Sequence, residues 1–185
     1  MELNIIKRDR LTPLALKMKR GDRTAASELY DELAPKVFGF LFSRTGTREI
    51  AEDLCQDIFV KLVEKIDGFD EKRGRFTVWF WRMVRNALID YYREKKETPF
   101  SSFEEETVAA MAVEEFPDFD TKFQYDKLIE FLKTLNDEER QLFELRHLAE
   151  MPYKEIAVVL ERSEGSLRVA ALRIKEKIKK GFDEI

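Results

Sequence analysis

The chain has 185 residues, 44% of them hydrophobic and 38% charged, a composition that suits a helix-rich globular protein of one medium domain or two small ones. The longest apolar runs are a few residues long and the first ten residues lack a signal-peptide pattern, so we expect a cytoplasmic protein without membrane insertion. One cysteine and one histidine supply neither an intramolecular disulfide nor a tetrahedral zinc site, and no cofactor is expected. Without a Gly-rich phosphate loop or a nucleophilic triad, the sequence gives no positive case for an enzyme.

Two amphipathic helices are predicted in the first third of the chain. Residues 21–43 open with a Gly-Asp turn signal and carry apolar residues at helical spacing, although Pro35 should end the helix, kink it or start a second one. Residues 48–67 form the clearest helix, because apolar side chains four residues apart make one wide face. The opposite face is acidic near its start, and it either contacts only water or forms an interface. Its polar residues include Asp53, Gln56 and Asp57.

The segment 72–96 combines large aromatic rings with eight bases and only two acids. A helix over residues 76–96 would place most of the aromatic and apolar side chains on one side and most of the basic ones on the other, with Trp79 and Trp81 at the boundary. Cations beside aromatic rings suit single-stranded nucleic acid, while the alternative is a core helix with a solvated basic back. The predicted inner side holds Phe76, Phe80, Met83, Val84, Ala87 and Tyr91, and the outer side holds Arg82, Arg85, Asn86, Ile89, Arg93 and Lys96.

An acidic segment follows. Residues 97–121 lose the helical period and contain two prolines, which predicts a flexible linker, either a spacer or a segment that threads along a partner. Residues 97–126 hold nine acids and one base. The net charge of −4 therefore hides an excess of 32 bases over 28 acids in the rest of the chain, and it does not exclude a nucleic-acid ligand.

The C-terminal part predicts further helices and a tight turn. A helix resumes at 122–135, and Asn136 or Asp137 is a natural N-cap for the next one. Pro152 starts a short helix, "ERSEG" turns the chain, and Ser163 caps a last helix. The pair resembles a helix-turn-helix, whose second helix enters the DNA major groove, although an ordinary helical hairpin has the same pattern. That helix would present Ser166, Leu167, Arg168, Val169, Leu172 and Arg173.

No alternating strand pattern appears, so we expect an all-α fold of two helical domains joined by the acidic linker. At this point the motifs resemble the sigma-70 family, specifically the small extracytoplasmic-function (ECF, group IV) sigma factors of bacterial RNA polymerase. "GDRTAASELYDELAPKVFGF", "AEDLCQDIFVKLVEKIDGFD" and "RGRFTVWFWRMVRNALIDYYREKK" are similar, in that order, to the family's region 2. "LNDEERQLFELRHLAEMPYKEIAVVLERSEGSLR" is similar to its region 4, and the resemblance covers nearly the whole chain from Gly21 onward.

The resemblance implies three parts: a region 2 domain at 1–96, the linker at 97–121 and a region 4 domain at 122–185. Region 2 would bind core RNA polymerase and recognise and melt the −10 promoter element, and region 4 would read the −35 element and contact the β flap. The implied contacts with the β′ clamp coiled coil are Asp53, Gln56 and Asp57. The implied −10 DNA residues are Phe69, Trp79, Arg82, Arg85, Asn86, Arg93, Lys95 and Lys96, with Asn86 matching a position that reads a flipped base. The −35 set is Ser166, Arg168, Val169, Leu172 and Arg173, of which the two arginines match family DNA contacts.

The sequence departs from the family pattern at two places. The turn carries Glu161 and Arg162 where the family usually has glycine and an apolar residue. Val169 and Ala170 stand where the family often has serine and a basic residue, which should make the base-reading surface more apolar and suited to thymine methyl groups.

The expected function is therefore a sigma factor of ECF type, without catalytic activity, that directs core RNA polymerase to promoter DNA. A cognate anti-sigma factor is a further candidate partner, which the sequence does not identify. A decoy that only sequesters an anti-sigma factor would not need the basic face of 76–96. A conventional dimeric helix-turn-helix regulator would leave the block 48–96 without a role, and a nucleic-acid enzyme would lack a nucleophile or an acidic metal cluster.

Overall fold

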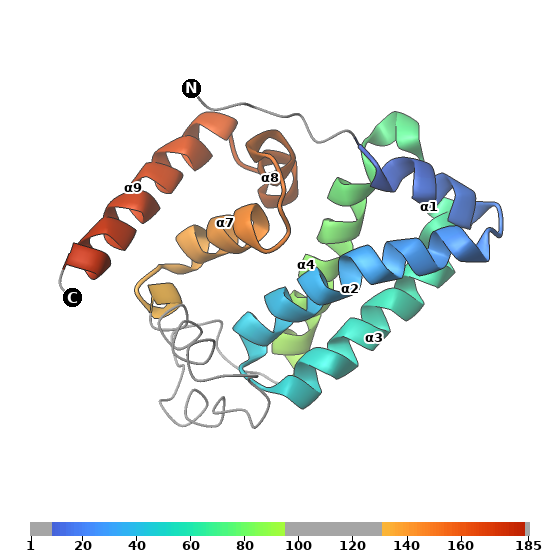
Figure 1. Cartoon of the computed structure of the whole chain (residues 1–185), viewed down its shortest axis with the longest axis horizontal. Helices are drawn as coiled ribbons and strands as arrows, with labels where there is room; N and C mark the ends of the chain where they lie inside the picture. Colours follow the sequence, from blue (N-terminus) through green and yellow to red (C-terminus); the bar gives the residue numbers. More distant parts are fainter. Residues whose placement is uncertain (1–8, 95–130, 184–185) are drawn as a thin grey trace.

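The structure is a computed structural model that describes residues 9–94 and 131–183, apart from the side chains after residue 179 (Figure 1). Within these ranges every regular element is a helix, as the sequence predicts. Four helices form an N-terminal unit and three form a C-terminal unit that lies beside it. The N-terminal helices are α1 (Leu11–Lys19), α2 (Arg23–Thr45), α3 (Arg48–Lys65) and α4 (Phe76–Glu94), and the C-terminal ones are α7 (Asp137–His147), α8 (Tyr153–Leu160) and α9 (Glu164–Asp183).

Helix α2 begins where the sequence predicts but passes through its proline. The Asp22 carboxylate caps the helix by accepting the N–H groups of Thr24 and Ala25. Pro35 neither ends the helix nor starts a second one, so that part of the prediction is wrong. Its side chain is exposed, as is that of Asp31 four residues earlier, so the carbonyl that loses its helical partner faces water.

Helix α1 is a nine-residue element that the sequence pattern did not reveal. It buries Leu14 and Ala15 and is tied to the start of α4 by a buried side chain. The Thr12 hydroxyl accepts the backbone N–H of Phe76, a donor that has no partner inside its own helix, at 3.0 Å. Helix α1 therefore helps to fix where α4 begins.

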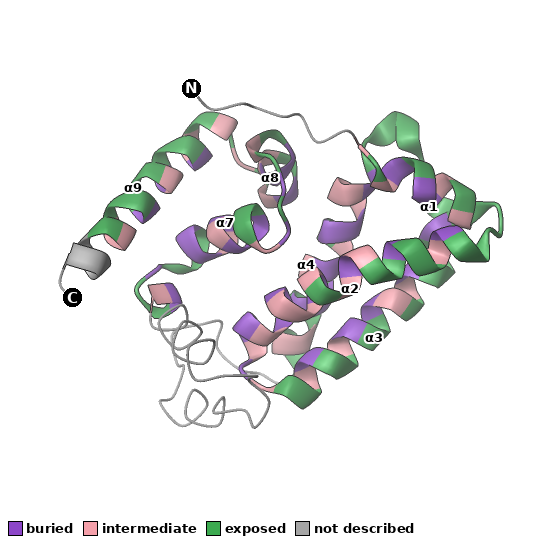
Figure 2. Ribbon diagram, in the orientation of Figure 1, coloured by how far each residue is buried: buried purple, intermediate pink, exposed green. Residues whose placement is uncertain are grey.

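Helices α3 and α4 bury the stripes that the spacing predicts, and two short 3₁₀ turns, Ile66–Gly68 and Glu71–Arg73, connect them. Figure 2 shows the buried stripes turned inward between the helices. Two expectations change in detail. Val63 of α3 is exposed, and Trp81 of α4, expected at the boundary, is fully buried with its ring 5.5 Å from the ring of Phe40. The buried residues of α3 are Ala51, Cys55, Ile58 and Leu62, and those of α4 are Phe76, Phe80, Trp81, Val84, Ala87 and Leu88.

The C-terminal unit confirms the predicted caps and turn. Asn136 is the N-cap of α7, and it forms a capping box with Glu139. The Ser163 hydroxyl accepts the N–H of Ser166 at the start of α9. Between α8 and α9 the chain turns at Glu161, which adopts the left-handed conformation with φ of 56°. Glu161 therefore adopts, at a cost, a conformation that glycine takes without a Cβ clash.

No helix in the described ranges is both long and apolar enough to cross a bilayer.

The strained turn yields a prediction. Glu161→Gly should raise the free energy of unfolding of the C-terminal unit by about 0.5–1 kcal/mol, because glycine adopts a positive φ without a Cβ clash. Chemical denaturation measures the change. The matched control is Glu176→Gly in the exposed middle of α9, which should lower stability by about 1 kcal/mol. A loss of stability in both variants would contradict the backbone account.

Candidate nucleic-acid interface

The outer side of α4 presents a row of cationic and amide side chains. Arg82, Asn86 and Arg93 are exposed and follow one another at intervals of about one or two turns, so they share a face. Arg85 beside them is half-buried, and Ile89 is exposed within the row. Lys95 and Lys96, which the sequence places at its end, lie outside the described residues.

Aromatic rings pack against one another beneath this row, on the core side of α4. The half-buried ring of Trp79 lies 5.6 Å from the ring of Phe69 and 5.8 Å from the ring of Phe76. Trp79 therefore keeps part of its ring accessible. Phe69 is only 2% exposed, so in this conformation it is a core residue and its ring offers no surface to a base. The aromatic rings fix the orientation of α4 and the direction of its outer row.

Helix α9 carries the second predicted DNA surface. Arg168, Val169, Leu172 and Arg173 are exposed, and the two apolar side chains keep 51% and 63% of their area accessible. Ser166 is half-buried and donates its hydroxyl to the carbonyl of Ser163. Ala170 is buried, so only Val169 of the predicted apolar pair adds to the outer surface.

The arginines around the turn already have partners. Arg168 donates to the carboxylate of Glu164 at 2.6 Å, and its guanidinium lies over the ring of Tyr153 at 5.3 Å. Arg162 donates to Glu138 of α7 at 2.9 Å, which ties the turn to the first helix of the unit. The second residue of the turn thus forms an ion pair with α7.

The exposed face of α3 is acidic at one end and apolar at the other. Asp53, Gln56 and Asp57 are all exposed, as the sequence predicts. Val60 and Val63 continue the face and are more than half exposed, although sequence reasoning did not assign them to it. Their spacing from Gln56 by about one and two turns is the signal that places them there. Val60 and Val63 thus add a small exposed apolar patch beside the carboxylates.

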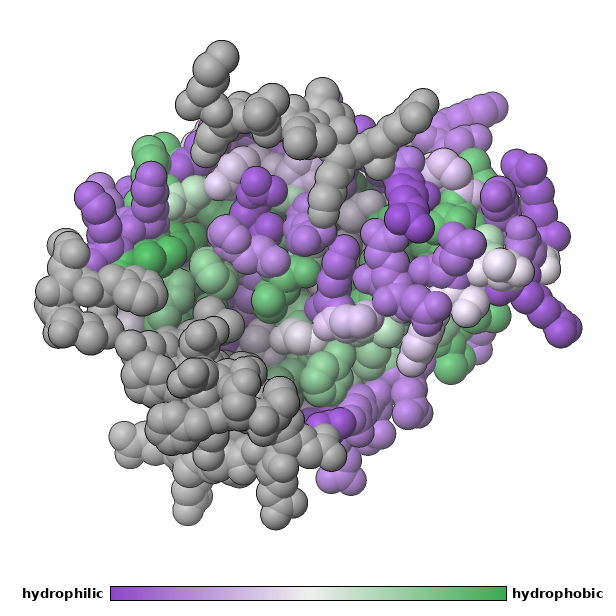
Figure 3. Space-filling model, in the orientation of Figure 1, coloured by the Kyte–Doolittle hydropathy of each residue, from purple (hydrophilic) through white to green (hydrophobic). Residues whose placement is uncertain are grey.

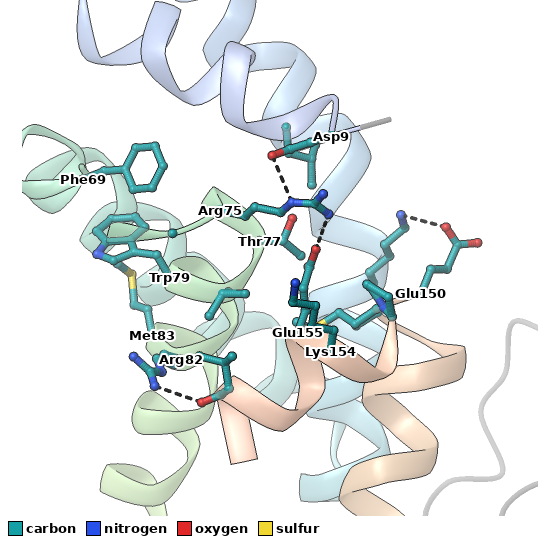
Figure 4. A pocket seen from close by; sticks show the side chains of 18 of the residues that line it. Asp9, Phe69, Arg75, Thr77, Trp79, Arg82, Met83, Glu150, Lys154 and Glu155 are labelled. Carbon is teal, nitrogen blue, oxygen red and sulfur yellow. Dashed lines mark hydrogen bonds and ion pairs between the residues drawn. The ribbon is translucent and has the colours of Figure 1, made fainter. Parts of the chain in front are cut away.

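The two units contact each other through α4 and α8, beside an open cleft of about 1800 Å³. In the close view of Figure 4, Arg75 extends between Asp9 and Glu155, and the guanidinium of Arg82 donates to the carbonyl of Val158. Figure 3 shows that polar side chains dominate the face in view, with apolar patches between them. The outer row of α4 therefore faces the C-terminal unit at one end.

Comparisons with known proteins agree with this architecture. The family model Sigma-70 region 2 matches residues 29–98, and the model Sigma-70, region 4 matches residues 125–178. The chain is 29% identical over 153 residues to the ECF RNA polymerase sigma factor SigM of Bacillus subtilis (strain 168), a match that covers 82% of this chain and 91% of that one.

Two solved structures share the fold. The structure of CnrH in complex with the cytosolic domain of CnrY has a TM-score of 0.69 and 21% identity, and the match covers 94% of this chain and 97% of that one. The sigma factor RpoE in complex with the anti-sigma factor NepR from Bartonella quintana has a TM-score of 0.65 and 17% identity, and it covers 85% and 96%. At these identities the likeness concerns the fold alone.

The matched regions together span most of the chain. The region 2 match lies in the N-terminal unit, and the region 4 match lies in the C-terminal unit. The chain belongs to the sigma-70 family, with the region 2 match over most of α2 and all of α3 and α4 and the region 4 match over α7, α8 and most of α9, and within that family it is an ECF RNA polymerase sigma factor. Sigma factors are transcription initiation factors and not enzymes.

Proposed function

We propose that this chain binds core RNA polymerase and directs it to promoters by reading the −35 element with α9 and opening the −10 element with α4. The observation that carries the proposal is the division of α4 into a buried aromatic side and an exposed row of Arg82, Asn86 and Arg93. Melted DNA offers bases and phosphates together, and this row offers an amide among cations. Phe69 supports Trp79 from the core. Lys95 and Lys96, which follow α4 in the sequence, are proposed as further −10 DNA contacts.

The helix α9 would enter the major groove, with Arg168 and Arg173 on either side of exposed Val169 and Leu172. Arginine can bond guanine edges or phosphates, while the apolar pair suits thymine methyl groups. Ser166 is proposed as a third polar contact. Arg168 would exchange its bond to Glu164 for one to DNA.

Docking on core polymerase is assigned to the exposed face of α3. Asp53, Gln56 and Asp57 would meet the β′ clamp coiled coil, and the neighbouring Val60 and Val63 add apolar area to the same contact. Region 4 would contact the β flap. We place the domain boundaries at 1–96 and 122–185, with the acidic linker at 97–121 between them. That linker lies outside the described residues.

Two further assignments follow from the same role. The chain would work in the cytoplasm, because core polymerase and promoter DNA are there. A cognate anti-sigma factor is a proposed partner, because the RpoE structure that shares this fold contains the anti-sigma factor NepR. A decoy that only sequesters such a factor would gain nothing from the cationic row of α4.

Run-off transcription on a genomic fragment library tests the proposal. Core polymerase with this protein should yield discrete promoter-specific transcripts that core polymerase alone does not make. Absence of such transcripts with active core enzyme would overturn the proposed function.

The assignment of the α4 face is tested by Asn86→Ala. This variant should lose about 1–3 kcal/mol of −10 preference or impair promoter opening, because it removes an amide that can bond a base edge. Binding to core polymerase should stay intact, and Glu28→Ala on the outer side of α2 serves as the control. If core binding is lost while −10 preference remains, the face has been assigned to the wrong partner.

The assignment of α9 is tested by Arg168→Ala. This substitution should weaken −35-dependent binding by about 1–3 kcal/mol, as expected for the loss of a base-contacting arginine. The matched control is Glu164→Ala, which removes the partner of Arg168 and leaves the arginine in place, and binding should then not weaken. Unchanged binding of Arg168→Ala in a promoter-fragment titration would remove that residue from the interface.

A further inference from the structure

A buried cluster of charged side chains joins the two domains, and no role proposed above uses it. Ser43 and Arg44 at the end of α2 meet Asp137, Arg140 and Glu144 of α7, about 100 residues later in the chain. We call these five residues the interdomain ion cluster. At its centre is the carboxylate of Glu144, which is 0% exposed.

Both oxygens of the Glu144 carboxylate accept hydrogen bonds. One oxygen accepts the Ser43 hydroxyl at 2.9 Å and Nε of Arg140 at 3.0 Å. The other accepts Nε of Arg44 at 2.7 Å. Arg44 also donates to Asp137 at 2.8 Å, and Arg140 donates to the Ser43 carbonyl. One domain thus supplies a cation for the buried anion of the other.

The burial of these charges makes them depend on one another. Burial alone would lower the pKa of Arg44, but the charge of Glu144 and the hydrogen bonds that Arg44 donates to Asp137 and Glu144 outweigh it, and the pKa is raised. The pKa of Arg140 is lowered by burial and by the charge of Arg44, against the opposing effect of Glu144. Two buried guanidinium groups lie side by side here because Glu144 lies between them. Removing its charge would leave them to repel each other.

The same closure occupies part of the DNA-facing row. Arg82 donates to the carbonyl of Val158 in α8 at 2.9 Å, and Arg75 donates to Glu155 of the same helix. Helix α8 packs against α4 and takes up one guanidinium nitrogen of the exposed Arg82 (Figure 4). A DNA strand bonded to the whole row would therefore compete with α8 for this guanidinium.

We propose that the closed arrangement is an autoinhibited state of the free chain, with the interdomain ion cluster as its latch, and that region 4 must leave α4 before promoter DNA can occupy the row. The inhibition of transcription rests on the proposed function. The closure of the two domains by the ion cluster is a property of the free chain and does not rest on it.

The chemistry of the cluster suits a contact that opens. Large buried apolar surfaces are costly to expose to water, whereas arginine and glutamate side chains regain hydration when they separate. The cluster is complete only when both domains are present, so it specifies one closed geometry. A latch of this kind holds the domains firmly in one position and still permits their release.

The first experiment measures the distance between the domains in the free chain. Spin labels at Glu64→Cys of α3 and Lys175→Cys of α9, in a Cys55→Ala background, report it by double electron–electron resonance. Glu144→Gln should shift the population from one short distance to a broad long-distance distribution, changing the open-to-closed ratio by about tenfold or more. Arg44→Gln makes the same test from the other domain.

Glu138→Gln is the matched control, because it makes the same chemical change on the same helix but breaks only an ion pair inside region 4. Its distance distribution should equal that of the unmodified chain. Circular dichroism confirms helix content in each variant. If both Glu144→Gln and Arg44→Gln keep the short distance, the cluster is not the latch, whatever the protein does in transcription.

The second experiment tests inhibition. Lys36→Cys and Glu150→Cys, whose native side chains are 3.4 Å apart across the domains, can be joined by a short reducible bis-maleimide in the Cys55→Ala background. The joined protein should give at least about tenfold less run-off product, and reduction should restore it. Equal transcription before and after reduction would refute autoinhibition. Run-off activity of the reduced form separates that result from a failure of the proposed function, in which no form is active.

Discussion

The row that α4 presents to a ligand depends on the aromatic packing beneath this helix. Phe76, Phe80 and Trp81 are buried along one side of this helix, with Phe76 and Phe80 stacked 5.7 Å apart. Interlocking rings of this size leave little freedom for the helix to rotate. The outer row from Arg82 to Arg93 therefore points in a fixed direction without help from its own side chains. The aromatic residues bring rigidity, and the side chains of Arg82 and Arg93 stay exposed.

This division explains how much of the molecule could be predicted from sequence. Period-based reasoning located α3 and α4 and most of their buried residues, because helix geometry turns spacing directly into faces. The caps at Asn136 and Ser163 were predictable for the same local reason. Helix α1 was not, because its nine residues carry little periodicity and no start signal was recognised there, such as Pro152 before the equally short α8. Two of the three outcomes expected at Pro35, the end of the helix and a new start, did not occur, because Leu33 and Val37 on either side of it are buried in one continuous helix.

The candidate site divides in the same way. Resemblance to a family transfers roles by position, but only packing decides exposure, and Phe69 and Ala170 are buried where the sequence suggested contact surface. The contacts between the domains were beyond prediction altogether. Arg44 and Glu144 are 100 residues apart, and nothing in the local pattern of α2 or α7 marks an arginine or a glutamate as buried. Charged residues on a helix are normally read as solvated.

The charges between the domains also explain how one chain can combine two binding surfaces that must not always be available. An apolar interface of similar area would either hold the domains together permanently or, after opening, expose an apolar patch that favours aggregation. Arginine and carboxylate groups avoid both outcomes, because each is acceptable in water and each needs a partner when buried. Arg82 follows the same logic on a smaller scale, since the carbonyl of Val158 and a phosphate oxygen satisfy the same guanidinium donors. Closure and DNA binding thus compete for the same hydrogen-bond donors, which couples the position of region 4 to the availability of region 2.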